Sequence, residues 1–207
     1  MKLIASTTSP FARKALVAAH ELGLSLEVEY LVTTVLAPNA ALGAVHPLIK
    51  LPTLITDDGL ALFDSRVIVE YLQSLAPAST ILPQTGPARF LVLRTQALAD
   101  GILEAAISVF YESMFRPEGM RSEAWVAAQT DKARRGLAEL EATTETWART
   151  ADSFDIGQIA IACTVGWIDF RDVVPGARSA CPALYTWFDS LAERPSMQAT
   201  VPRAPAK

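Results

Sequence analysis

The chain has 207 residues, of which 51% are hydrophobic, and its 18 basic and 22 acidic side chains give a formal net charge of −4. A chain of this length buries roughly 70% of the area that its unfolded form exposes, so it can fill a core without disulfides, as one domain or two small ones. The acidic balance argues against nucleic-acid and anionic-membrane partners, because phosphate binding needs an excess of basic residues.

Cysteine and histidine are scarce. The two cysteines, Cys163 and Cys181, and the two histidines, His20 and His46, are too few and too scattered for a structural zinc site or a disulfide framework. We therefore expect no metal. The N-terminal apolar run is too short for a signal peptide, and the longest uncharged apolar stretch, 156–168, is too short to span a bilayer. These features predict a cytoplasmic globular protein that does not bind membranes.

The first half of the chain alternates strand and helix patterns. Residues 2–5 form a short apolar strand candidate, and Ser9-Pro10 is a typical helix start, with serine as N-cap and proline in the first turn. Apolar residues then recur at helical spacing until Gly23, a natural stop, and residues 26–30 alternate with a period of two. A strand, a helix and a strand in this order favour a parallel pair with a right-handed crossover.

Two further strands and a helix follow an irregular stretch over residues 38–47. The apolar runs 53–56 and 60–63 flank Asp57-Asp58-Gly59, and Asp-Gly is a strong hairpin signal. The next helix is predicted to carry one apolar face, made of Val67, Ile68, Tyr71, Leu72 and Leu75. The order β-α-β then β-β-α is that of a thioredoxin-like sheet.

Only helical patterns occur in the second half. They cover residues 87–115, 122–150, 156–172 and the stretch from Pro182 to Arg194. The third is almost wholly apolar, which predicts a buried central helix, and Asp155 with Gln158 fits a capping box at its start. We predict an α/β thioredoxin-like domain over residues 1–78, a linker over 79–86 and an all-α helical bundle domain over 87–207.

Three segments of the first half would meet at one end of such a sheet. The segment ending in Ser9-Pro10 offers a helix N-terminus, which stabilises an anion such as a thiolate, although a serine there also serves as a simple cap. The Leu51-Pro52 bond would leave the backbone groups of Leu51 free if it were cis, but only ≈ 5–6% of X–Pro bonds are. Asp64 and Ser65 are either helix caps or ligands for the charged end of a peptide.

In chain order, these segments closely resemble bacterial, serine-type glutathione S-transferases. The resemblance is carried by TSPFARK, HPLIKLPTLITDDGLALFDSRVIVEYL and DIGQIAIACTVGWIDFR, and it extends along essentially the whole chain. It implies the glutathione transferase fold, with glutathione as co-substrate and Ser9 as the catalytic residue that favours the thiolate; Thr8 is the alternative donor. The glutathione-binding residues that it implies are Ser9, Phe11, Lys50, Leu51, Pro52, Asp64 and Ser65.

The resemblance also implies a homodimer, in which the first half of one subunit packs on the long helices of the other. In some relatives an acid at the position of Asp100 reaches the partner's glutathione. Two departures from the family pattern lie before the Lys50 segment: His46 stands where asparagine is frequent, and Ile49 where glycine is common. Phe110 and Phe115 are candidates for either the pocket wall or the core.

Three functions compete at this point. The first is conjugation of the glutathione thiolate to small hydrophobic electrophiles, a detoxification reaction. The alternative is a non-catalytic member of the same fold that binds glutathione or another protein. A glutathione-dependent redox enzyme is disfavoured, because no cysteine precedes Cys163 and that thiol lies in an apolar helix, where an inert role is expected.

Overall fold

The computed structural model describes residues 1–78, 81–148 and 154–204. The chain divides into two compact units: Met1–Leu82 together with the segment from Arg194 onward, and Pro83–Glu193. The stretch that the sequence predicts as a linker, 79–86, spans the first boundary, and its residues 79–80 lie outside the described part. The segment from Arg194, which the sequence analysis assigned to the helical domain, groups instead with the first unit.

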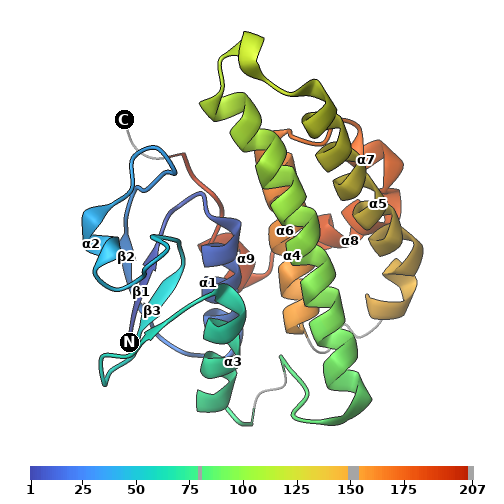
Figure 1. The fold of residues 1–207 in the computed structure, drawn as a ribbon. Helices are drawn as coiled ribbons and strands as arrows, with labels where there is room; N and C mark the ends of the chain where they lie inside the picture. The colour runs from blue at the N-terminus through green and yellow to red at the C-terminus, as the bar shows by residue number, and fades with distance from the viewer. Residues whose placement is uncertain (79–80, 149–153, 205–207) are drawn as a thin grey trace. The chain divides into compact units, whose positions relative to one another are not determined.

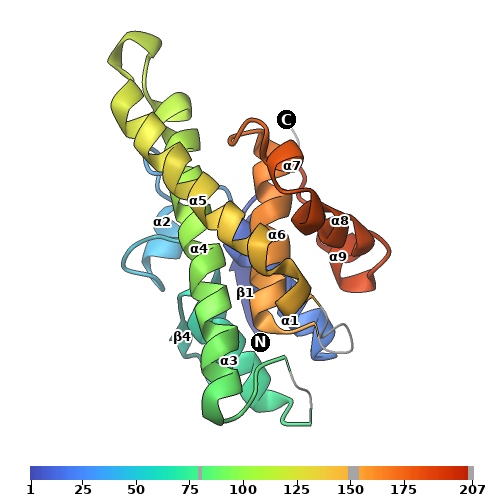
Figure 2. The same cartoon turned by 90° about the vertical axis from the view of Figure 1, so that its right-hand side faces the viewer.

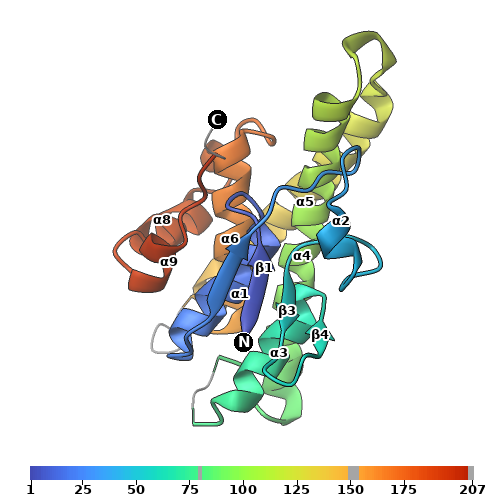
Figure 3. The ribbon, with the colours of Figure 1, turned by 90° about the vertical axis from the view of Figure 1, so that its left-hand side faces the viewer.

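The first unit is built on a mixed sheet of four strands in the order β2-β1-β3-β4. The strands are β1 (Lys2–Ala5), β2 (Glu27–Tyr30), β3 (Thr53–Ile55) and β4 (Ala61–Leu62). β1 pairs with β2 in parallel, and β3 pairs with both β1 and β4 in antiparallel fashion, as Figures 1 and 3 show. This is the thioredoxin-like arrangement, so the fold class predicted for the first half is confirmed.

Two helices of this unit, α1 (Pro10–Glu21) and α3 (Ser65–Leu75), pack against each other. α1 begins where the sequence predicts, because the Ser9 hydroxyl accepts from the Ala12 amide at 3.2 Å and Pro10 stands in the first turn. The chain leaves the helix at Gly23, whose φ of +67° suits a residue without a Cβ.

The predicted buried face of α3 is partly wrong. Ile68, Val69 and Leu72 are the buried apolar residues, whereas Val67 is 46% exposed and Leu75 is 44% exposed. The apolar stripe of α3 is broad enough to cover two adjacent rows of side chains. Packing against α1 and β3 buries only the row at positions i, i+3, i+4 and i+7 from Ser65, and the second row remains at the surface.

The sequence did not predict two short helices of the first unit. α2 (Ala40–Gly43) is a single turn, capped by the Asn39 side chain, inside the stretch expected to be irregular. α9 (Pro195–Ala199) packs on α1, although the sequence suggested only a helix end at Arg194-Pro195. Glu21 of α1 accepts hydrogen bonds from Arg194 Nε at 2.8 Å and from the Ser196 hydroxyl, so a half-buried cluster of polar contacts attaches α9 to α1.

The second unit is entirely helical over its described residues. Its long helices are α4 (Gly86–Phe115), α5 (Glu123–Trp147) and α6 (Ile156–Arg171), followed by α7 (Ala177–Ala180) and α8 (Pro182–Ser190), with one 3-10 turn at Glu118–Met120. α5 and α6 both pack on α4 (Figure 2). The end predicted for the second helix, residues 149–150, lies outside the described part. Among the described helices, none is both long and apolar enough to cross a membrane.

α6 is the buried centre of this unit, as its composition predicts. Every residue from Ile156 to Ile168 is buried, and Cys163 in its middle is 1% exposed. Asp155 and Gln158 form the expected capping box at its start. The Thr164 hydroxyl donates to the Ala99 carbonyl oxygen at 3.1 Å, which satisfies a buried polar group and fixes α6 against α4.

Candidate functional site

The strand register brings the three predicted segments of the first unit to one edge of the sheet. Ile4 of β1 lies opposite Thr53 of β3, so the end of β1 is beside the start of β3. Leu54 of β3 lies opposite Leu62 of β4, so the end of β4 also lies there. Three segments are therefore neighbours: the loop that follows β1, the residues that precede β3 and the residues that follow β4. In the chain, Ser9 of the first segment and Asp64 of the third are 55 positions apart.

Ser9 and Thr8 occupy the loop between β1 and α1. Both side chains are half-buried, and Ser9 uses its hydroxyl oxygen as an acceptor for the helix cap, which leaves the hydroxyl proton for another acceptor. Phe11, in the first turn of α1, is also half-buried, with the Lys14 ammonium 5.7 Å from its ring centroid. The amide of Arg203 donates to the Thr7 carbonyl oxygen at 3.1 Å, so the chain beyond α9 reaches this loop, a contact that the sequence did not indicate.

The second segment enters β3. The Leu51–Pro52 peptide bond is cis; Leu51 is half-buried, and Lys50 is exposed. The Thr53 hydroxyl donates to the Lys50 carbonyl oxygen at 3.1 Å and so fixes the backbone at this point. Ile49 has a φ of +51°, the left-handed region, which strains a β-branched side chain by about 1–3 kcal/mol. The position where the family commonly has glycine thus retains the backbone conformation that glycine favours.

The third segment begins α3. Asp64 is exposed and caps the helix, accepting from the Arg66 amide at 2.9 Å, while Ser65 in the first turn is 2% exposed. The first amides of α3 and the positive end of its dipole favour a carboxylate at this place. The exposed Asp64 carboxylate suits an ammonium group. Together they match the zwitterionic end of an amino acid.

His46, which the sequence marks only as a departure from the family pattern, is part of this sheet edge. Its ring stacks on Phe63 with centroids 3.9 Å apart, and it is 3% exposed. It thereby joins the loop before Lys50 to the residue before Asp64. The Leu48 amide donates to His46 Nδ1 at 3.0 Å, which requires an unprotonated Nδ1. Burial, together with the charge of Lys50, lowers the pKa of His46 and so favours the neutral ring.

The remaining candidates belong to the second unit. Asp100 of α4 is 1% exposed, and Phe110 and Phe115 are half-buried in the last turns of the same helix. Phe110 packs edge-to-face on Trp167 of α6, with ring centroids 5.7 Å apart, so it serves at least in part as core.

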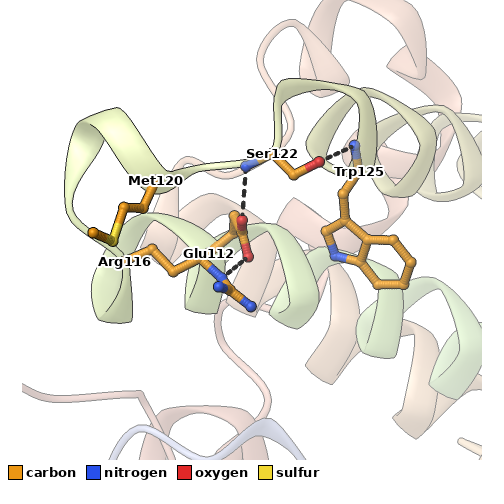
Figure 4. A pocket seen from close by; sticks show the side chains of 5 residues that line it. All are labelled: Glu112, Arg116, Met120, Ser122 and Trp125. Carbon is orange, nitrogen blue, oxygen red and sulfur yellow. Dashed lines mark hydrogen bonds and ion pairs between the residues drawn. The ribbon is translucent and has the colours of Figure 1, made fainter.

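A small cavity of about 300 Å³ lies where α4 turns into α5 (Figure 4). Its central acid, Glu112, accepts from Arg116 Nε at 2.8 Å and from the Ser122 amide at 2.9 Å, and the Ser122 hydroxyl accepts from the Trp125 amide. The backbone bond from Ser122 lowers the pKa of Glu112 despite the opposing effect of burial. The hydrogen bond between Glu112 and Ser122 joins the end of α4 to the start of α5, so it stabilises the helical hairpin that the two helices form.

Comparison with known proteins agrees with this architecture. A family model described as the glutathione S-transferase N-terminal domain matches residues 8–75, and one described as the C-terminal domain matches residues 123–190. The "Uncharacterized GST-like protein YibF" of Escherichia coli K12 is 35% identical over 204 residues, 98% of each chain.

Two solved structures extend the comparison. A glutathione transferase family member from Pseudomonas fluorescens Pf-5, solved with bound glutathione, has a TM-score of 0.93 and 40% identity, over 98% of this chain and 99% of that one. A glutathione S-transferase from Methylobacillus flagellatus KT, also with glutathione bound, has a TM-score of 0.89 and 36% identity over the same shares. The same sheet edge brings Ser9, Pro52 and Ser65 together, and the relatives match this chain over nearly their full length. The chain therefore belongs to the glutathione S-transferase family.

Proposed function

We propose that the chain is a glutathione transferase that conjugates the thiolate of glutathione to small hydrophobic electrophiles. The observation that carries this proposal is the gathering of Ser9, Leu51-Pro52 and Asp64-Ser65 at one edge of the sheet. The relatives from Pseudomonas fluorescens and Methylobacillus flagellatus, both solved with glutathione, support the choice of ligand. Because glutathione is a cytosolic thiol, a cytoplasmic location is part of the same proposal.

Each segment has a role that its chemistry suits. The α3 N-terminus with Ser65 binds the γ-glutamyl carboxylate, and Asp64 accepts from its ammonium group. The backbone of Leu51, beside Pro52, pairs with the cysteinyl part in the manner of an added strand. Lys50, exposed near this backbone, is long enough to reach the glycine carboxylate, and Phe11 provides an apolar wall.

Ser9 acts on the sulfur. Its hydroxyl proton, which the helix cap does not use, donates to the glutathione sulfur, and the N-terminal end of α1 adds a favourable field. Both effects stabilise the thiolate over the thiol and so lower the thiol pKa. The thiolate then attacks the electrophilic carbon: a C–S bond forms, and the leaving group departs with its electron pair.

Calorimetric titration with glutathione tests the binding part. Removing a partner of a charged group costs about 1–3 kcal/mol, so Ser65→Ala should weaken binding by roughly 5- to 150-fold. Ser74→Ala, an exposed serine near the end of the same helix, is the matched control and should bind as the wild type does. Equal affinities of wild type and Ser65→Ala would remove the argument for this site.

Conjugation of 1-chloro-2,4-dinitrobenzene, followed by the absorbance of the thioether, tests the catalytic part. Turnover that depends on Ser9 supports the transferase. Glutathione binding without turnover would point instead to a non-catalytic, glutathione-binding member of the family.

We also propose a homodimer, on the basis of apolar side chains left at the surface of each unit. In α4, Phe90 is 70% and Leu91 is 61% exposed, and in α3 Val67 is 46% exposed. Clusters of exposed apolar side chains mark interfaces, and a two-fold dimer is the commonest closed assembly. Sedimentation should give a dimer for the wild type and a monomer for Leu91→Glu, with Ala142→Glu on α5 as the charge-matched control. A wild-type monomer at micromolar concentration would refute this proposal.

A further inference from the structure

The C-terminal segment of the first unit, from Arg194 to Arg203, runs along α1 in the opposite direction (Figure 1). Its start lies beside the end of α1, where Arg194 and Ser196 donate to the Glu21 carboxylate. Its end lies beside the start of α1, where the Arg203 amide donates to the Thr7 carbonyl oxygen at 3.1 Å. The segment belongs to the same compact unit as α1 and the sheet, so all of these contacts lie within one unit.

Arg13 holds the middle of the C-terminal segment against α1. Its side chain, which is 7% exposed, donates from Nη2 to the Met197 carbonyl oxygen and from Nε to the Thr200 hydroxyl oxygen, both at 3.3 Å. The Thr200 hydroxyl in turn donates to the Ser196 carbonyl oxygen at 2.8 Å. Both hydrogen bonds that the Arg13 side chain makes among the described residues therefore go to this segment. Because a buried guanidinium without acceptors is costly, Arg13 favours the segment in this place.

The end of the segment holds the loop that carries Ser9. Among the described residues, the bond from the Arg203 amide is the one hydrogen bond that joins residues 6–8 to a segment other than α1. Its acceptor is the carbonyl of the Thr7–Thr8 peptide. Because a peptide is planar, the backbone has only two soft torsions per residue. A fixed Thr7–Thr8 plane therefore restricts the path of the backbone into Ser9.

The position of the Ser9 hydroxyl decides how well it can stabilise a thiolate. A hydrogen bond weakens steeply as its geometry departs from linearity, and a displacement of about 1 Å can cost roughly 100-fold in rate. α1 fixes Ser9 from one side, since the Ser9 oxygen accepts from the Ala12 amide at 3.2 Å. The C-terminal segment fixes the loop from the other side, through the residue two positions before Ser9.

We propose that the C-terminal segment positions the Ser9 hydroxyl for the glutathione sulfur, with the Arg203 backbone amide and the Arg13 side chain as its positioning groups. Neither group touches the sulfur, and both act through the loop. The hold of the segment on the loop rests on its own contacts, whereas the effect on the sulfur rests on the proposed transferase function. Arg13 and Thr200 are 187 positions apart in the chain, so no local pattern indicates this arrangement.

Hydrogen exchange tests the hold on the loop without any ligand. Arg203→Pro removes the donor, because proline has no backbone N–H. Arg203→Ala keeps the amide and measures the effect of the side chain alone, and Ala204→Pro places the same ring at the next position, which is exposed. By mass spectrometry, peptides over residues 6–12 should exchange roughly 2- to 10-fold faster in Arg203→Pro than in either control. Peptides of α6 should exchange alike in all four proteins.

The thiol pKa of bound glutathione, read from the ultraviolet absorbance of the thiolate, tests the positioning of Ser9. Arg203→Pro should raise this pKa by roughly 0.3–1 unit relative to Arg203→Ala, as expected for the loss of one neutral hydrogen bond. In a Ser9→Ala background the rise should vanish, because a double-mutant cycle isolates the part that passes through this hydroxyl. Thr200→Val removes one acceptor of Arg13 and should raise the pKa in the same direction; no rise would refute the role of Arg13.

Three results separate the possible failures. Equal loop exchange in Arg203→Pro and Arg203→Ala would overturn the hold of the segment on the loop. Faster exchange with an unchanged thiol pKa, or an equal rise in the Ser9→Ala background, would overturn the positioning of Ser9. A wild-type protein that leaves the glutathione thiol pKa at its solution value would overturn the proposed transferase function, while the exchange experiment would still decide the contact. Thermal unfolding of each variant verifies that folded proteins are compared.

Discussion

Replacing Asp155 with alanine removes the N-cap of the buried helix α6. The Asp155 carboxylate accepts from the Gln158 amide at 2.9 Å, and the Gln158 side-chain oxygen accepts from the Asp155 amide at 2.9 Å. The Gln158 side-chain amide also donates to the Trp147 carbonyl oxygen at 3.0 Å, which links the start of α6 to the end of α5. In Asp155→Ala the Gln158 backbone amide loses its acceptor next to Ile156, a residue with no exposed surface.

The expected loss follows from this geometry. Truncating an N-cap to alanine costs about 0.5–2 kcal/mol of unfolding free energy. Each kcal/mol lowers Tm by about 2–4 °C for a chain of this size, so the variant should unfold about 1–8 °C below the wild type. Glutathione affinity, measured where both proteins are folded, should not change, because Asp155 belongs to the helical unit and has a purely structural role.

Asp155→Asn is the matched control, since its side chain keeps an acceptor but does not titrate. Burial raises the pKa of Asp155, in spite of hydrogen bonds from the Gln158 and Gly157 amides. A carboxyl whose pKa is raised on folding stabilises the folded state below its unfolded pKa of about 3.9, and this contribution is lost as the pH rises through the folded value. The stability of wild type relative to Asp155→Asn should therefore be greatest in acid and decrease toward neutrality.

Thermal unfolding monitored by circular dichroism across this pH range, with calorimetry for glutathione, measures all three quantities. An unchanged Tm in Asp155→Ala would refute the capping argument. A weaker glutathione affinity at unchanged stability would refute the structural assignment of Asp155.

Three further predictions concern other parts of the molecule. Ser9→Ala should raise the thiol pKa of bound glutathione, by about one pKa unit for each 1.4 kcal/mol of lost thiolate stabilisation, and an unchanged pH–rate profile would assign the role to another donor. Burial raises the pKa of Glu21, but hydrogen bonds from Arg194 and Ser196 outweigh burial, so the pKa is lowered on folding. The wild type should therefore lose stability relative to Glu21→Gln as the pH falls below about 4, which denaturant titrations at several pH values measure. Gly136→Ala would place a Cβ 2.3 Å from Ile102 Cγ1 and should cost about 1–3 kcal/mol in the same titrations; an unaffected midpoint would mean that α4 and α5 can separate slightly.

Short-range signals determined where the elements begin and what type they are. Ser9-Pro10 starts α1, and Asp155 with Gln158 starts α6, because the partners that satisfy the first amides of a helix lie within three residues. The hairpin at Asp57-Asp58-Gly59 is equally local, with Gly59 at a φ of +88°. The resemblance of a few ordered segments then sufficed to predict the family and the residues of the proposed glutathione site.

The tertiary structure decided which of several equivalent surfaces are used. The apolar stripe of α3 is compatible with burying Val67 or Val69, and only its contact with α1 and β3 selects Val69. Such a choice depends on residues far away in the chain, so no local pattern contains it.

The same holds for contacts between side chains that lie far apart in the chain. His46 meets Phe63 across 17 positions, and Arg171 meets Phe110 across 61, with nothing in the intervening sequence to indicate either pair. The sequence by itself therefore determined the elements, their caps and the family, whereas only the fold decided that a histidine joins two segments of one sheet edge and that the Arg171 guanidinium of α6 packs on the Phe110 ring of α4. The reason is physical: caps and turns are satisfied by neighbours in the chain, but buried rings and charges are satisfied by whatever residues packing brings to them.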